Sequence, residues 1–183
     1  MNLENSKQNN YIKKNIVNLY RQSSKLEINL ILRDNKVYLS LSIYPIKDGV
    51  NINNPLIENK HSKNLYDYNN GLRIDLGINE ISKLLSFLNN PNTQNLSLIH
   101  KTDKLKSVVF NKLQNKQNTS ILSIVISEKF NNQGTNKSID DVFNGNKSEK
   151  QLKFILNDDE IILLETFARF TINKYFQVKL SSN

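Results

Sequence analysis

Basic and aromatic side chains are interleaved along several predicted strands of this sequence. Single-stranded nucleic acid requires positive charge along its phosphates and flat side chains beneath its bases. Each such residue taken singly is more simply explained as a cross-strand partner or an ordinary surface charge, but the net charge of the chain favours the set as a binding surface. The candidate nucleic-acid-binding residues are Lys25, Arg33, Lys36, Tyr38, Tyr44, Arg73, Lys101, Lys104, Lys106, Phe110, Lys112 and Lys129.

The charge balance of the whole chain points to a polyanionic partner. The formal net charge is +8 over 183 residues. A basic surface of this kind favours nucleic acid, and an anionic membrane less strongly. The alternative is that the charge only maintains solubility.

Residues that perform catalysis are scarce. The chain has no cysteine and only two histidines, His61 in a predicted loop and His100 in a predicted strand. It also lacks a glycine-rich phosphate loop, a histidine pair at metal-ligand spacing and a nucleophile motif. The sequence therefore predicts a non-catalytic protein without a cofactor or a metal.

The sequence shows no signal for export or membrane insertion. Its apolar runs are shorter than the ~18–20 residues that a membrane span requires. The first ten residues, MNLENSKQNN, lack the apolar core of a signal peptide. We expect an intracellular protein, in the cytoplasm, nucleoid or an organelle matrix, with no membrane partner.

Two predicted groups of strands are each followed by a predicted helix. Alternation of apolar and polar residues predicts a β-hairpin over 26–43, with a tight turn at Asp34-Asn35 where positive φ is favoured. The same alternation predicts a second hairpin from Leu96–Lys101 and Lys106–Leu113, and a further strand over Ser120–Phe130.

Each helix is predicted directly after a strand. The strand 72–76 runs through Gly77 into apolar residues at helical spacing, which end at Asn90-Pro91. The strand 152–156 runs into a helix that ends near Phe176, with Asn157 as N-cap and Glu160 completing a capping box. Apolar residues lie on more than one side of this last helix, so we expect it to be covered on more than one side.

The remaining segments set the predicted domain boundaries. Residues 1–24 are assigned to a basic, partly mobile arm, whose stretch YIKKNIVNLYRQ fits a short amphipathic helix as well as it fits an arm or strand. Residues 25–183 are assigned to one domain with two halves, 25–91 and 95–177. A long polar connection before Gly71 contains a possible short strand near 65–68, and the Asn/Gly/Ser-rich stretch 131–150 reads as a flexible loop.

The chain from Lys25 to Phe176 resembles the Whirly family of single-stranded DNA-binding proteins and their relatives, the mitochondrial guide-RNA-binding editing factors. The resemblance rests on the order strands, helix, strands, helix, and on four stretches whose apolar spacing is similar to the family's, including a strand with a histidine in the corresponding place, His100. These stretches are IDLGINEISKLL, LSLIHK, SILSIVISEKF and KFILNDDEIILLETFARF.

The resemblance implies an α+β fold with two antiparallel sheets crossing roughly at right angles and helices packed at their ends. It also implies binding along sheet edges and assembly into homo-oligomers, dimers or tetramers. Together with the basic and aromatic residues, it predicts sequence-tolerant binding of single-stranded nucleic acid, DNA ahead of RNA. The alternative is a non-catalytic structural subunit of a transcription or ribonucleoprotein complex.

Overall fold

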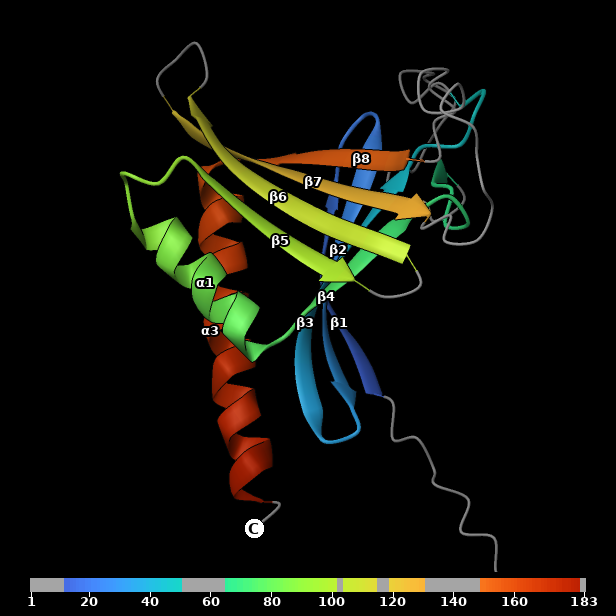
Figure 1. Ribbon diagram of the computed structural model, residues 1–183. Coiled ribbons are helices and arrows are strands. Elements are labelled where there is room, and N and C mark those ends of the chain that lie inside the picture. The colour runs from blue at the N-terminus through green and yellow to red at the C-terminus, as the bar shows by residue number, and fades with distance from the viewer. Residues whose placement is uncertain (1–11, 51–64, 102–103, 115–118, 131–148, 182–183) are drawn as a thin grey trace, which may run out of the picture.

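The chain forms an α+β fold in which two groups of strands are each followed by a helix (Figure 1). The computed structural model describes residues 12–50, 65–101, 104–114, 119–130 and 149–181. Its eight named strands form two four-stranded antiparallel sheets, each with its strands in chain order. The predicted order of strands, helix, strands, helix is confirmed.

Sheet 1 is formed by the N-terminal half of the chain. Its two central strands form the predicted hairpin, in register from Ser24↔Pro45 to Arg33↔Lys36. Asp34 and Asn35, at the turn, have φ of 50° and 56°. Because only a few residue types tolerate positive φ, Asx residues here fix both the turn and the register. The strands are β1 (Ile12–Tyr20), β2 (Ser24–Arg33), β3 (Lys36–Pro45) and β4 (Leu72–Leu76).

The basic stretch near the N-terminus is a strand rather than a helix or a separate arm. β1 pairs along its length with β2, and a register shift between Asn15 and Val17 interrupts the pairing. Pairing with a strand already formed by the hairpin outweighs a weak helical pattern, because β1 contributes Val17 and Leu19 to the side of the core. The domain therefore begins before Lys25, while residues 1–11 lie outside the described part.

Sheet 2 is formed by the C-terminal half. The predicted hairpin and the strand after it are present. Asn95 pairs with Asn111 within the hairpin, and Leu122 pairs with Leu156 at the other edge of the sheet. Its last strand begins at Glu149, so the stretch predicted as a loop ends two residues earlier than expected; residues 131–148 lie outside the described part. The strands are β5 (Asn95–Lys101), β6 (Lys104–Gln114), β7 (Ser120–Phe130) and β8 (Glu149–Leu156).

The possible strand near 65–68 is reduced to a single bridge between Ile46 and Tyr66.

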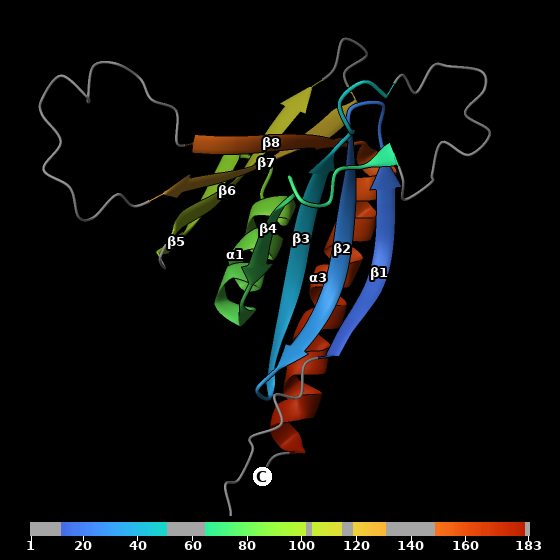
Figure 2. The same ribbon diagram turned by 90° about the vertical axis from the view of Figure 1, so that its right-hand side faces the viewer.

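The two sheets cross at a steep angle (Figures 1 and 2), and one face of each contributes to a shared core. Inward residues of both sheets are almost fully buried and form one cluster with residues of the helices. Its sheet members include Leu26, Ile28, Leu39, Leu41, Ile74, Val108, Phe110, Leu122, Ile124 and Phe154.

Both helices begin directly after a strand and pack beside the core. Helix α1 (Ile78–Asn89) begins after Gly77, whose N–H donates to the Glu80 carboxylate at 3.0 Å. Helix α3 (Asp158–Leu180) begins with the predicted capping box, in which Asn157 Oδ1 accepts from Glu160 N–H and Glu160 accepts from Asn157 N–H, each at 3.0 Å. These bonds satisfy free N–H groups of the first turn.

Arg21, in the β1–β2 connection, ties sheet 1 to the start of α3. Its guanidinium donates to the Glu160 carboxylate and, at 3.1 Å, to the Ile155 carbonyl oxygen. The same group lies 5.0 Å from the centre of the Phe154 ring. This side chain thus adds a polar link between the two halves of the chain, which also share the apolar core.

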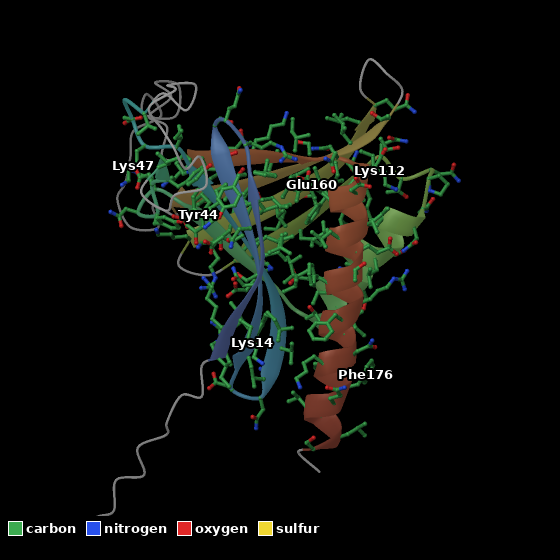
Figure 3. All side chains as sticks on the ribbon, turned by 180° about the vertical axis from the view of Figure 1, so that it is seen from behind. Lys14, Tyr44, Lys47, Lys112, Glu160 and Phe176 are labelled. Atoms are coloured by element: carbon green, nitrogen blue, oxygen red, sulfur yellow. The ribbon has the colours of Figure 1, made fainter. Side chains whose placement is uncertain are left out.

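The prediction that α3 is covered on more than one side is wrong within this chain. Its fully buried residues are Leu164, Ala168 and Thr171, which share one side. The opposite side carries exposed apolar residues, since 52% of Phe170 and 56% of Phe176 are accessible. Figure 3 shows Phe176 on the part of α3 that extends beyond sheet 2. Among the described residues, no helix is long and apolar enough to cross a membrane.

Candidate nucleic-acid interface

The side of sheet 1 that faces away from the core, here called outer face 1, carries polar, basic and aromatic residues on every strand. This follows from strand alternation, because residues between the buried apolar positions point to the opposite face. The cross-strand register places Lys25 beside Tyr44, Ile31 beside Tyr38 and Ser42 beside Arg73. Six of the predicted site residues belong to this face: Lys25, Arg33, Lys36, Tyr38, Tyr44 and Arg73.

A hollow of about 690 Å³, here called the junction hollow, lies where outer face 1 meets the edge of sheet 2. Strands β2, β3 and β4 contribute the sheet 1 side, the start of α1 contributes Glu80, and β5 and β6 contribute the sheet 2 side. The hollow brings together four predicted site residues from three strands of sheet 1 and one of sheet 2. They are Arg33, Tyr38, Arg73 and Lys106.

Arg33 and Tyr38 form a stacked pair at this hollow. The guanidinium carbon of Arg33 lies 4.9 Å from the centre of the Tyr38 ring. A cation over an aromatic face is attracted by the ring's electrons, which holds both planar groups in place. Arg33 is exposed and Tyr38 is half-buried. The pair therefore offers a flat, positively charged surface.

Arg73 is oriented by a carboxylate beside it on β4. Its Nε and Nη2 atoms donate to the two oxygens of Asp75, each at 2.8 Å. Burial alone would raise the pKa of Asp75, but the hydrogen bonds and the charge of Arg73 hold that pKa below its usual value. Asp75 is therefore ionised at neutral pH. It positions the Arg73 guanidinium while offsetting part of its charge.

Two lysines share one carboxylate on the sheet 2 side. Glu128 accepts from Lys104 at 2.8 Å and lies 3.0 Å from the Lys106 ammonium. The bond from Lys104 is the largest of the effects that lower the pKa of Glu128. Lys106 also donates to the Arg73 carbonyl oxygen at 3.4 Å, which links the two sheets. Two positive charges against one negative leave this cluster positive.

His100 and Glu80 belong to the hollow although the sequence analysis did not assign them to the site. His100 Nε2 lies 2.7 Å from a Glu80 oxygen, and the other Glu80 oxygen caps α1. The predicted β5–β6 hairpin contained the signal, because its register pairs His100 with Lys106. Among the described residues, no cluster of histidine and acidic side chains is able to hold a metal ion.

Comparison with known proteins rests on the fold alone. No family model and no curated protein sequence matches the chain. Among solved structures, the crystal structures of the MRP1/MRP2 proteins of Trypanosoma brucei are similar, with a TM-score of 0.52 and 9% sequence identity over 92% of this chain and 86% of that one.

The fold is Whirly-like. The two crossed antiparallel sheets and the helix after each set of strands are the arrangement that the resemblance implied. Within the Whirly-like fold, the junction hollow lies at the edge of both sheets.

The structure contradicts the assignment of Phe110 as a base platform. Phe110 is fully buried in the core, and its ring centre lies 6.4 Å from that of Phe87. Its strand partner Ile124 is also in the core. The face that Phe110 shares with Lys106 is thus the inner face of sheet 2, and the lysine reaches solvent because it lies near the strand's end.

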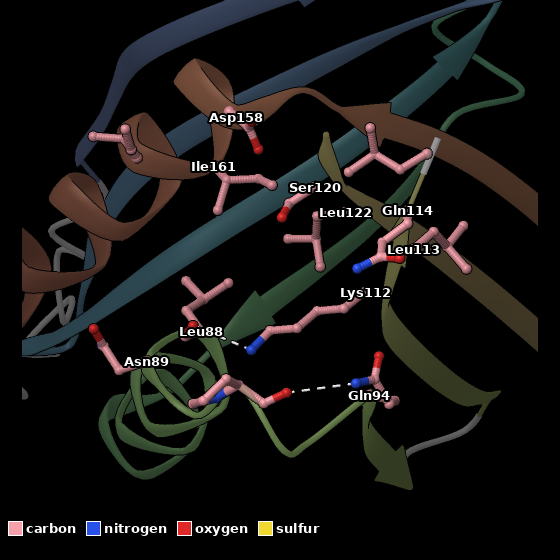
Figure 4. Close-up of a pocket in the computed structure, with 13 residues that line it drawn as sticks. Leu88, Asn89, Gln94, Lys112, Leu113, Gln114, Ser120, Leu122, Asp158 and Ile161 are labelled. Carbon is pink, nitrogen blue, oxygen red and sulfur yellow. Dashed lines mark hydrogen bonds between the residues drawn. The ribbon is translucent and has the colours of Figure 1, made fainter. Parts of the chain in front are cut away.

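Lys112 has a structural role at the C-terminal end of α1 (Figure 4). Its ammonium donates to the carbonyl oxygens of Phe87 at 2.7 Å, Leu88 at 3.2 Å and Asn90 at 2.7 Å. Burial lowers the pKa of Lys112. Because the last carbonyls of a helix lack partners within it, this lysine satisfies them and all three of its donors are used. It lines a separate hollow of about 890 Å³.

Lys25 is also unavailable to a ligand, because only 1% of its surface is accessible. Its ammonium donates to Glu27 at 2.6 Å and to the Tyr68 hydroxyl at 3.0 Å. Burial opposes the charged form, yet these two bonds raise the pKa of Lys25 above its ordinary value. The group is therefore a charged, paired part of sheet 1.

Tyr44 is half-buried rather than free on a solvated face. Its ring centre lies 4.7 Å from that of Tyr68, and a Cβ atom at Gly71 would overlap the ring. Burial raises the pKa of Tyr44. Its ring is held by its neighbours, so Tyr38 is the better platform of the two.

The remaining predicted residues lie around the hollow or away from it. Lys36 is exposed at the hairpin turn beside Arg33, and Lys104 shares Glu128 with Lys106. Lys101 and Lys129 are exposed on the outward side of sheet 2, where Lys129 pairs with Glu149 at 3.0 Å. The sequence-predicted set thus divides into a cluster at the hollow, two lysines on another face and four residues with structural roles, Lys25, Tyr44, Phe110 and Lys112.

Proposed function

We propose that this protein binds single-stranded nucleic acid non-catalytically and with little sequence preference, DNA ahead of RNA, at the junction hollow and outer face 1. Phosphates lie along Arg33, Arg73 and Lys106, and an unstacked base lies on Tyr38. The proposal is supported by the Whirly-like fold and by the resemblance of the sequence to the Whirly family of single-stranded DNA-binding proteins.

The observation that carries the proposal is the convergence of three cations and one aromatic ring in the hollow. Against Arg33, Arg73 and Lys106 stand two acidic side chains, Asp75 and Glu80, so the cations are in excess before His100 is counted. A groove that combines positive charge with a partly accessible ring suits a flexible strand, whose bases are free to stack. A duplex keeps its bases stacked inside, and the single ring would then contribute little.

We also propose that the protein assembles into homo-oligomers through the outward side of α3. Four exposed apolar residues support this, with accessible fractions of 61% for Ile162, 52% for Phe170, 56% for Phe176 and 77% for Leu180. They recur at intervals that keep them on one side of the helix. Large apolar side chains gathered in this way mark contact surfaces.

The test is equilibrium binding of labelled 20-nucleotide single-stranded DNA, single-stranded RNA and duplex DNA at several salt concentrations. For a single strand, log affinity falls with log salt by about 0.7 for each phosphate neutralised. We expect three contacted phosphates or more, and weaker binding to duplex. Lys83→Ala, on the exposed side of α1, is the matched control and leaves affinity unchanged. A slope near zero, or equal loss in the control and in Arg73→Ala, contradicts the proposal.

A further inference from the structure

Sheet 2 carries aliphatic side chains on both of its faces. The inner face packs into the core, but the side that points away from it, here called outer face 2, is also aliphatic at its centre. Ile99 on β5 is 56% accessible and Ile155 on β8 is 39% accessible. Val109 and Val125, which are half-buried, face each other between them on β6 and β7. Antiparallel sheets with one solvated face usually carry polar residues there.

These four residues form a continuous diagonal band across the sheet. Val109 and Val125 are direct cross-strand neighbours, and Ile99 and Ile155 each lie one step along the adjacent strand. With strands 4.8 Å apart and a rise of 3.4 Å per residue, the band is ~20 Å long. An α-helix covers that distance with about 13 residues.

Small side chains flank the band and leave room for a close approach. Lys153 pairs with Val125, and Asn111 follows Val109 on the same face of β6. The other residues beside the band in the register are serines on three strands. They are Ser97, Ser107, Ser123 and Ser127.

The border of outer face 2 is basic. Lys101, Lys129 and Lys153 all point to this face and are exposed, and the acidic residue among them, Glu149, is paired with Lys129. A second copy of the chain on this face would bring like charges together. The described residues of the face include no aromatic ring on which a base could stack.

We propose that outer face 2 is the docking site for an acidic amphipathic α-helix of a partner protein. The helix lays an aliphatic stripe of three to four turns along the band, and carboxylates on its flanks meet the lysines at the border. Exposed aliphatic patches with a polar border mark protein interaction sites, and complementary charge selects among partners. This surface is distinct from the junction hollow.

The experiment uses a fluorescein-labelled helical peptide of 16 residues with leucine at helical spacing and glutamate on both flanks. One control peptide has lysine in place of each glutamate, and a second has glutamine in place of each leucine. Fluorescence anisotropy measures their binding to the whole protein. Three variants are compared: Val109→Ser with Val125→Ser, Lys101→Glu with Lys153→Glu, and Ile12→Ser as an exposed aliphatic control on β1.

We expect saturable binding of the acidic peptide alone, weakened at least tenfold by the paired valine change and at least tenfold by the paired lysine change. Ile12→Ser leaves it unchanged, and oligonucleotide affinity stays within twofold in the valine variant. Equal binding of the lysine-flanked peptide, or unchanged binding in both paired variants, overturns the proposal. So does a fall in oligomer mass or oligonucleotide affinity in the valine variant, since a second copy or a nucleic acid would then cover the face. If the valine variant does not fold, the lysine variant, changed only at exposed residues, decides.

Discussion

Outer face 1 and outer face 2 belong to sheets of the same size and connectivity, yet they present opposite chemistry. Outer face 1 has ionised groups held by partners, such as Lys25 with Glu27 and Arg73 with Asp75. Outer face 2 has valine, isoleucine and serine at its centre, with lysines only at the border. A charged, ring-bearing surface suits a polyanion, whereas an aliphatic surface with a basic border suits an acidic segment of another protein. The same sheet topology in two halves of one chain therefore does not imply the same partner.

The largest expected effect is on the free energy of unfolding, which should depend strongly on the inner face of sheet 2 and little on its outer face. Phe110→Ala should lower the free energy of unfolding by about 3–5 kcal/mol, because it removes a fully buried ring from the core. Ile99→Ala, at an exposed position on the same sheet, should change it by less than about 0.5 kcal/mol. Urea denaturation measures both. Similar losses for the two variants would mean that outer face 2 is covered in the isolated protein.

The paired charges of outer face 1 should make its stability depend on pH. Burial would raise the pKa of Glu27, but Lys25 and Lys13 lower it below the ordinary 4.5. A lowered carboxyl pKa means that the stabilisation is present above the unfolded-state pKa and is lost as pH falls through the folded-state pKa.

Glu27→Gln should therefore cost about 3 kcal/mol at pH 7, since it leaves the Lys25 ammonium buried without its carboxylate partner. The difference from the wild type should shrink below pH 4.5 as Glu27 becomes protonated. Chemical denaturation at several pH values measures it. A difference that stays constant through the acid range would show that the charge of Glu27 is not what stabilises outer face 1.

Within outer face 1, the two tyrosines should behave differently. Tyr38→Ala should weaken single-strand binding by roughly 1–3 kcal/mol, the contribution of one stacked base, with little change in stability. Tyr44→Ala should mainly lower the thermal midpoint, because its ring packs on Tyr68. Oligonucleotide titration and thermal melting on both variants test this. The reverse result, in which Tyr44→Ala weakens binding more than Tyr38→Ala, would place the bound nucleic acid at the Tyr44 end of outer face 1.

The smallest expected effect is on the salt dependence of binding when one cation is removed from either face. Arg33→Gln should reduce the slope of log affinity against log salt by about 0.7, one phosphate contact. Lys153→Gln, on outer face 2, should leave the slope unchanged, although it too removes one positive charge. If both variants reduce the slope equally, binding follows the total charge of the protein, and the distinction between the two faces fails for nucleic acid.

Most of the fold was predictable from the sequence because its signals are local. Alternation marked the hairpins, Asp34-Asn35 marked a turn that needs positive φ, and Asn157 with Glu160 marked the start of the last helix. The sequence did not decide whether residues 12–20 form a helix, an arm or a strand, because the strand β1 depends on pairing with β2. The exposed side of α3 was missed for a related reason, because apolar spacing does not show whether a neighbour exists to cover it.

The candidate site was only partly predictable, because sequence does not identify which side of a sheet faces the core. Phe110 was assigned to the surface because it shares a face with Lys106 and Lys112. A strand of 11 residues extends over ~37 Å at 3.4 Å per residue. Its ends pass beyond the core, so one face carries buried residues in the middle and lysines at both ends. Arg33, Arg73 and Lys106 lie together only because the two sheets cross, and the sequence does not show how the sheets cross.

The contact between Arg21 and Glu160 has a consequence for synthesis of the protein in the cell. The two residues are 139 positions apart, and Glu160 also closes the N-terminal cap of α3. At 5–20 residues per second, a ribosome needs roughly 7–28 s to add the intervening chain. Until the end of that interval sheet 1 lacks α3, which contacts β3, and sheet 2 lacks its last strand, β8. Part of the apolar face of sheet 1 is therefore exposed until the last helix has been synthesised, and transiently exposed apolar surface of this kind favours aggregation.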